Sequence, residues 1–192
     1  MTLDNLVVPA IYVLTLPAPA LVAAWRRRAL STPLALLVIY GVVAFLEGTY
    51  TWHLADLGVH NLWVSHLFTP FEAIMFLWMF AQWQVHDLSR LTILFSIPLF
   101  VVLWVVLLLT ADSLEDFPKY AKSVECLLVV AVAAYTLISR SQHLVAPLSR
   151  YAWFWVCAGT LVYFSYVAVL NPIADFMLPR SRNIDSALDL NG

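Results

Sequence analysis

Three glutamates lie where an acidic side chain is costly, inside long apolar runs of the sequence. They are Glu47, Glu72 and Glu125, and the remaining acids of the 12 in the chain lie between these runs or at their ends. A charged side chain at membrane depth costs at least about 2.5–3.5 kcal/mol, so such a residue is expected to be paired, neutral or functional. Carboxyl groups in this setting relay protons, balance the charge of a ligand, or act as an acid or base.

Polar residues accompany the glutamates at helical spacing. Asn61, Ser65, Thr69 and Glu72 follow intervals of four, four and three residues, which places them on one face of a helix. Two further stripes consist of Tyr40, Glu47, Tyr50 and Thr51 in one run and of Gly159, Tyr163 and Tyr166 in another. The stripes predict a polar lining that faces inward, although serine and threonine in membrane helices often bond to their own backbone.

The three glutamates are predicted to share one pocket in the outer half of a helical bundle. The candidate ligand-binding or relay residues are Glu47, Glu72, Glu125, His66, Tyr50, Tyr163 and Lys122. The alternative for each glutamate is a structural role, as a protonated carboxyl that bonds to a neighbouring helix. No catalytic residue is assigned, because the sequence lacks a Gly-x-Ser-x-Gly turn, a glycine-rich phosphate loop and a Cys-x-x-Cys pair.

Lys122 precedes Glu125 by three residues, a spacing that brings two side chains together on a helix. The first interpretation is an intrahelical ion pair whose lysine reaches toward the outer membrane surface. The second interpretation is a site for an anionic headgroup or carboxylate, held by Lys122 together with Lys119.

Histidines offer a different chemistry near the same end of the predicted bundle. His66 lies within an apolar run and is predicted to hydrogen-bond one of the intramembrane glutamates. A metal site of His53, His60 and His66 is a weaker alternative, because no His-x-x-x-His or Glu-x-x-His pair sets two ligands on one helical face. We predict no metal and no cofactor.

The overall composition identifies the environment of these residues. Hydrophobic residues make up 62% of the 192 residues and charged residues 11%, with a mean hydropathy of +0.85. A soluble domain has about 45–50% apolar and about 25% charged residues. These values exclude a soluble globular domain, a disordered chain and, with a net charge of −2, a nucleic-acid-binding surface. The lipid bilayer is therefore the expected partner.

Six apolar runs are long enough to cross a bilayer, since one crossing needs about 20 residues. The predicted fold is a single all-α domain over residues 1–192, a polytopic transmembrane helical bundle. The spans are expected at about 6–25, 34–54, 61–83, 91–110, 119–139 and 151–170. Residues 171–192 are expected to form an external tail or the start of a further helix, which would lead into a seventh span.

Charged residues between the runs predict the orientation of the bundle. Arg26, Arg27 and Arg28 directly follow the first run, and cytoplasmic connections are rich in arginine and lysine. No basic region precedes that run, so we expect it to be retained as a span rather than cleaved as a signal. The N-terminus is therefore expected on the outer side.

Three segments carry a resemblance to known sequences: Phe68-Thr69-Pro70-Phe71-Glu72, Ser123-Val124-Glu125-Cys126-Leu127-Leu128, and the run from Phe154 to Ser165. Together they resemble a loose group of uncharacterised bacterial seven-span integral membrane proteins with no assigned activity. The resemblance implies a location in the bacterial cytoplasmic membrane, and it implies Glu72 and Glu125 as recurrent acids. The chain departs from that group because six rather than seven spans are evident.

The sequence as a whole favours a ligand-binding or sensory membrane module whose polar pocket opens outward. The ligand would be a small molecule or a lipid, and short cytoplasmic connections would pass a signal to a membrane protein partner. Three alternatives stay open: a structural subunit of a larger membrane complex, a small proton-coupled transporter, and an intramembrane enzyme that acts on lipid.

Overall fold

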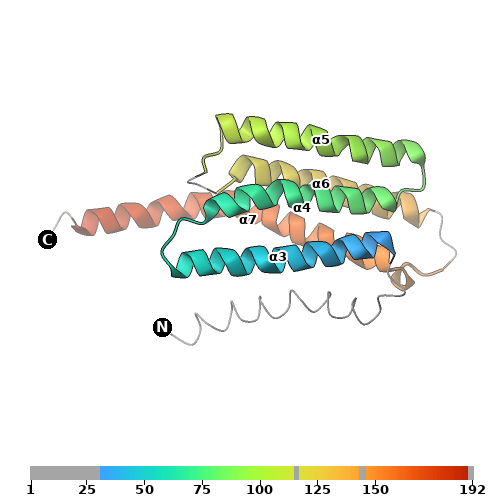
Figure 1. Ribbon diagram of the computed structural model, residues 1–192, viewed down its shortest axis with the longest axis horizontal. Coiled ribbons are helices and arrows are strands. Elements are labelled where there is room, and N and C mark those ends of the chain that lie inside the picture. The colour runs from blue at the N-terminus through green and yellow to red at the C-terminus, as the bar shows by residue number, and fades with distance from the viewer. Residues whose placement is uncertain (1–30, 115–116, 143–145, 190–192) are drawn as a thin grey trace. The chain divides into compact units, whose positions relative to one another are not determined.

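The computed structural model describes residues 31–114, 117–142 and 146–189, and this part of the chain is helical without strands (Figure 1). Of residues 171–189 only the backbone is described. Among these residues, five helices are long and apolar enough to cross a membrane. They fall into two compact units, the first ending at Pro118 and the second beginning at Lys119.

The first unit contains three helices in a row: α3 (Thr32–Asp56), α4 (Leu62–Gln82) and α5 (Asp87–Thr110). Helix α4 lies between the other two and packs against both of them (Figure 1). Short connections join the three helices, and short connections make consecutive helices antiparallel neighbours.

The limits of α3 follow from residues at its two ends. Pro33 occupies the first turn, where a helix needs no N–H from the residue. Gly58 has a positive φ of 68° at the other end. Its N–H donates to Ala55 O at 3.0 Å, and the N–H of Val59 donates to Leu54 O at 2.9 Å. This pair of bonds satisfies the last carbonyls of the helix and requires glycine at the left-handed position.

The core of the first unit lies along α4, whereas α5 presents most of its surface outward. Leu77 and Phe80 on α4 are fully buried, but Leu88, Phe95 and Leu109 on α5 are 77%, 73% and 78% exposed. An apolar surface of this extent is unstable in water and stable against lipid chains. The helices and their exposed apolar faces are therefore those of an integral membrane protein.

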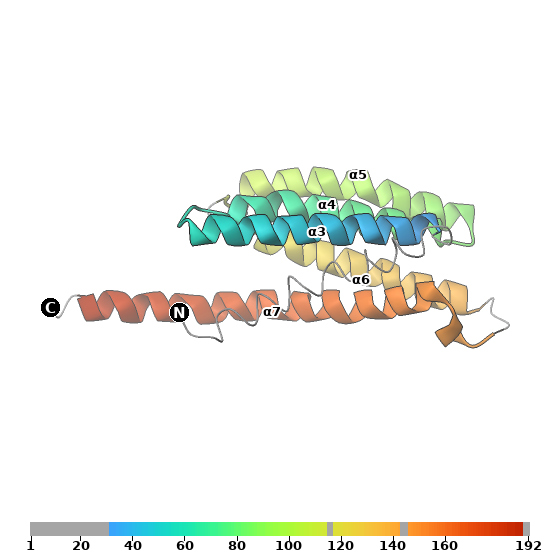
Figure 2. The ribbon, with the colours of Figure 1, turned by 60° about the horizontal axis from the view of Figure 1, so that its bottom comes forward.

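The second unit contains α6 (Lys119–Ser141), the short 3₁₀ helix η2 (Leu148–Arg150) and α7 (Ala152–Asp189). Helix α6 packs along α7, and α7 runs on well beyond α6 (Figure 2). Within α7, residues Ala152–Leu170 are apolar enough to span a membrane.

Five of the predicted spans correspond to these helices. The runs at 34–54, 61–83, 91–110, 119–139 and 151–170 match α3, α4, α5, α6 and the first part of α7. The first predicted span, 6–25, lies outside the described residues. The count of six spans, the seventh span and the single domain stay predictions.

The expectation that the last helix stops near residue 170 is corrected by the structure. Helix α7 passes through Asn171 and Pro172 without a break and ends at Asp189, whereas an external position of residues 171–192 stays a prediction. A proline removes one backbone hydrogen bond, which membrane helices tolerate, and the sequence after it, from Ile173 to Leu178, is apolar except for Asp175.

Candidate functional site

Glu72 lies at the contact between α4 and α3. It is 1% exposed, and the phenol of Tyr40 on α3 donates a hydrogen bond to its Oε1. The Tyr40 ring packs edge-on against Phe76, with ring centres 4.8 Å apart, and lies 6.1 Å from the ring of Phe68. A neutral donor from the neighbouring helix therefore satisfies this buried carboxyl group, and the bond links two helices of the first unit.

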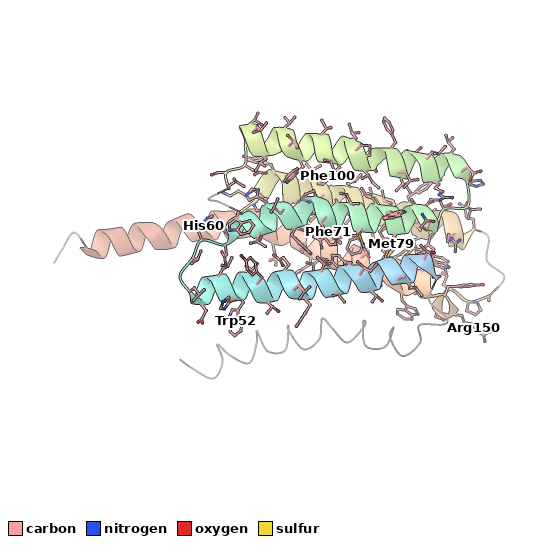
Figure 3. The ribbon with its side chains drawn as sticks, viewed as in Figure 1. Trp52, His60, Phe71, Met79, Phe100 and Arg150 are labelled. Carbon is pink, nitrogen blue, oxygen red and sulfur yellow. The ribbon has the colours of Figure 1, made fainter. Side chains whose placement is uncertain are left out.

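A shallow hollow beside this contact is apolar. Its lining side chains are Leu36, Leu37, Tyr40, Met75, Phe76 and Met79. Figure 3 labels Met79 on α4. Tyr40 is the polar member of this lining, and its hydroxyl is already bonded to Glu72. The hollow is therefore not the polar pocket expected from the sequence, and a glutamate-lined pocket stays a prediction.

Glu47 has a partner on its own helix. The Thr51 hydroxyl donates to Glu47 Oε1 at 3.3 Å, and the Asn61 amide donates to the Thr51 carbonyl at 3.0 Å. The bond from Asn61 ties the end of α3 to the start of α4. Glu47 itself is half-buried. Tyr50 is 46% exposed, with its ring edge-on to Trp63 at 6.3 Å. The two candidate residues on α3 thus lie at a partly open surface.

His66 is buried on α4 and is bonded to the segment that follows α5. Its Nε2 lies 2.9 Å from Ser113 O, and because a carbonyl oxygen accepts, Nε2 carries the donated proton. The predicted bond from His66 to an intramembrane glutamate stays a prediction. His60 lies in the connection between α3 and α4 (Figure 3). In the described ranges, no three His, Cys, Asp or Glu side chains gather as a metal site, so His53, His60 and His66 do not form one there.

Part of the polar stripe on α4 is satisfied by its own helix. The Thr69 hydroxyl donates to Ser65 O at 2.9 Å, four residues earlier. This is the local bonding that serine and threonine favour in membrane helices. At the two ends of the stripe, Asn61 bonds to the Thr51 carbonyl of α3 and Glu72 bonds to Tyr40 of α3. The stripe therefore fastens neighbouring helices of the first unit.

The second unit holds a buried pair of opposite charges. Lys122 Nζ lies 2.8 Å from Glu125 Oε2, and the two side chains are 11% and 0% exposed. The same ammonium lies 5.8 Å from the centre of the Phe164 ring on α7. The intrahelical pair predicted from the spacing is confirmed, but its lysine lies against a buried aromatic ring rather than at the surface.

Tyr163 lies at the edge of this group. It is 48% exposed, and its ring stands at 89° to the ring of Phe164, with centres 5.1 Å apart. The structure thus brings the predicted residues Lys122 and Tyr163 to Phe164, and Lys122 in turn to Glu125. An aromatic ring beside an ammonium is a favourable electrostatic contact in a site shielded from water. The group thus consists of the Lys122 ammonium, the Glu125 carboxylate and the apolar ring of Phe164.

Sequence reasoning missed three partners of the candidate residues. Tyr40 was one residue of a predicted stripe, so a signal for it existed, but the stripe did not say which acid it meets. Phe164 adjoins the predicted Tyr163, but the sequence around it contains many aromatic residues, and nothing in the sequence distinguishes Phe164 from them. Ser113 contributes a backbone carbonyl, for which a sequence carries no signal. The convergence of Glu47, Glu72 and Glu125 on one pocket stays a prediction.

No protein family, curated protein or solved structure matches this chain. A function for the protein therefore has to be inferred from the geometry of its side chains.

Proposed function

We propose that this protein is a ligand-responsive integral membrane module whose α6–α7 unit binds a small amphiphilic anion, a carboxylate on an apolar body. The observation that carries the proposal is the Lys122–Glu125 ion pair, buried within a membrane-spanning helix and covered by Phe164. The ligand carboxylate would take the place of the Glu125 carboxylate on Lys122.

The placement of the pair argues against a purely structural role. Lys122 and Glu125 lie on the same helix, and an ion pair at this spacing stabilises a helix by only about 0.2–0.5 kcal/mol. Removing two charges from water costs several kcal/mol per ion before their attraction is counted. The ion pair itself lies within α6, whereas the Tyr40–Glu72 bond joins α3 to α4. Ionisable groups that are kept within a membrane in spite of this desolvation cost are typically functional.

The chemistry of the group suits exchange of one carboxylate for another. An ammonium offers three donors, and a ligand carboxylate restores the interaction that Glu125 gives up. The Phe164 ring lies next to the ammonium and is fully buried, so the apolar body of the ligand would reach it only by separating side chains of α6 and α7. Displacement of Glu125 would alter the packing of α6 on α7, which is the conformational output of the module.

We infer the orientation and location from the arginines. Arg26, Arg27 and Arg28 favour a cytoplasmic position after the first run, which puts the N-terminus outside. In that arrangement the start of α6, with Lys122, faces the outer leaflet. The resemblance to bacterial seven-span proteins supports a location in the cytoplasmic membrane of a bacterium, and a membrane protein partner would receive the signal of the module.

The test uses the full chain in nanodiscs and hexanoate as the probe, with 1-hexanol as its uncharged counterpart. Thermal unfolding is followed at increasing concentrations of each compound. We expect hexanoate to raise the unfolding midpoint more than hexanol does, since binding to the folded state stabilises it. The double variant Lys122→Gln/Glu125→Gln keeps polar side chains without a buried charge and should lose the difference.

Arg90→Gln is the matched control, because it removes one exposed cation from the first unit. It should respond to hexanoate as the wild type does. Equal shifts with hexanol and hexanoate, or an unchanged hexanoate response in the double variant, would contradict the proposal and favour a structural subunit.

A further inference from the structure

The turn between α6 and α7 is flanked by two arginines. Arg140 lies in the last turn of α6, and Arg150 ends η2 directly before α7 (Figure 3). The sequence contains no aspartate or glutamate from residue 126 to residue 174. The two arginines therefore give this stretch of almost fifty residues a purely positive charge.

Aromatic side chains at this turn set the position of Arg140. Its guanidinium carbon lies 5.8 Å from the centre of the Trp153 ring, and Trp153 is 5% exposed. The ring of Tyr151 lies 5.9 Å from the same indole. A guanidinium beside an aromatic ring is held by a cation–π contact, and the planar fork of its N–H groups matches phosphate oxygens. Trp153 thus acts as a positioning residue for Arg140.

A second indole marks the membrane boundary at the same turn. Trp155 is 61% exposed, and its Nε1–H donates to Ser149 O at 2.9 Å. An exposed indole with a satisfied N–H is typical of the interface between headgroups and acyl chains. Arg150 adjoins Ser149 and is exposed, so its charge lies at that level.

The length of α6 agrees with this position. Arg140 follows Lys122 by 18 residues, which is about 27 Å along a helix. The hydrocarbon core of a bilayer is about 30 Å thick. Arg140 therefore lies at the opposite end of α6 from the buried Lys122 group, at the level of one membrane interface.

We propose that the corner formed by Arg140, Arg150 and Trp153 binds the phosphate headgroup of an anionic phospholipid. The two guanidinium groups donate to the phosphate oxygens, and the acyl chains lie against the exposed face of Trp155. A lipid is favoured over a free anion because Arg150 adjoins Ser149, whose carbonyl accepts a hydrogen bond from the exposed indole of Trp155, at the level where a headgroup joins its chains. This inference does not depend on the ligand proposed for Lys122.

The experiment is native mass spectrometry of the full chain released from nanodiscs that contain equal amounts of phosphatidylglycerol and phosphatidylcholine. The wild type should retain phosphatidylglycerol preferentially. Replacement of Arg140 or Arg150 by glutamine should lower this preference about fivefold each, and the double variant should abolish it. Arg140→Lys keeps the charge without the planar fork and should retain part of the preference.

Arg90→Gln, which removes an exposed arginine from the first turn of α5, is the matched control and should leave the preference unchanged. A double variant that retains phosphatidylglycerol like the wild type would overturn the proposal, and so would an equal loss in the control. Displacement of the lipid by millimolar inorganic phosphate would also overturn it, in favour of a site for free anions. The thermal unfolding midpoint of each variant verifies that the fold is intact.

Discussion

The two units of this protein each bury a glutamate in a membrane-spanning helix, but they give it different partners. Glu72 in the first unit accepts a hydrogen bond from a neutral phenol on the neighbouring helix. Glu125 in the second unit lies 2.8 Å from an ammonium three residues earlier on its own helix. Both residues are almost completely buried, at 1% and 0% exposure. Burial alone therefore does not distinguish them.

The kind of partner distinguishes a contact that holds two helices together from a buried pair of charges on one helix. A neutral donor on another helix satisfies a carboxyl group at little electrostatic cost and holds two helices together. The Lys122–Glu125 ion pair lies within α6, with Phe164 of α7 beside its lysine, and it carries the desolvation cost of two charges. The first arrangement is explained by stability, whereas the second is the observation on which the proposed binding role rests.

Removal of one charge from the Lys122–Glu125 pair should produce the largest effect. In Glu125→Leu the Lys122 ammonium stays buried without its carboxylate, and we expect the free energy of unfolding to fall by about 3–5 kcal/mol. The double variant Lys122→Met/Glu125→Leu should be close to the wild type or more stable, because no uncompensated charge is left. Reversible unfolding by SDS in mixed micelles measures both values. A double variant as unstable as the single one would mean that the pair is a structural fastener, like Tyr40–Glu72.

Loss of the phenol in the first unit should have a smaller effect. Tyr40→Phe removes the hydrogen bond to Glu72 but keeps the ring packed on Phe76, so we expect a loss of about 1–2 kcal/mol. Tyr50→Phe is the control, since that side chain is 46% exposed, and its stability should not change measurably. The same SDS titration compares the two. If Tyr40→Phe lost more unfolding free energy than Glu125→Leu, the Glu72 contact would contribute more to stability than the Glu125 contact, contrary to this prediction.

His66 provides a third buried contact, a hydrogen bond from its Nε2 to a backbone carbonyl, and it should behave like Tyr40. His66→Phe removes the bond to Ser113 O, and we expect a loss of about 1 kcal/mol. The effect should be local, with faster amide hydrogen exchange at Asp112, whose N–H bonds Leu107 O at 2.8 Å. His53→Phe, at an exposed position, should leave this exchange unchanged. Unaltered exchange in His66→Phe would show that the segment after α5 is held by other contacts.

The helices of the described region were predictable because they depend on local sequence. Apolar runs of about 20 residues, prolines at starts such as Pro33 and charged or polar ends define a membrane helix without reference to the rest of the chain. The end of α7 was not predictable in this way. The Asn171-Pro172 pair is typical of a helix end in water, but a proline inside an apolar segment is accepted within a membrane helix.

The candidate site was predictable only as far as its residues share a helix. The spacing of Lys122 and Glu125 fixes their meeting, since both lie on α6. Contacts between helices depend on rotation and register, which one sequence does not specify. For this reason Tyr40 and Phe164 were not identified as the partners of Glu72 and Lys122. A backbone acceptor such as Ser113 O carries no information in its side chain at all.

Replacement of Glu47, the third glutamate within an apolar run, should have the smallest effect and tests whether the two units act separately. Glu47 is half-buried, and its hydrogen-bond donor Thr51 lies on the same helix at 3.3 Å, so Glu47→Gln should lower the free energy of unfolding by less than about 0.5 kcal/mol. The measurement is the same SDS titration, extended to a double-mutant cycle with Glu125→Gln. Independent sites give additive losses, whereas groups that share a pocket show a coupling of about 0.5–3 kcal/mol. A loss well above that expectation, together with strong coupling, would mean that Glu47 and Glu125 meet, and the division between a fastening unit and a binding unit would then have to be abandoned.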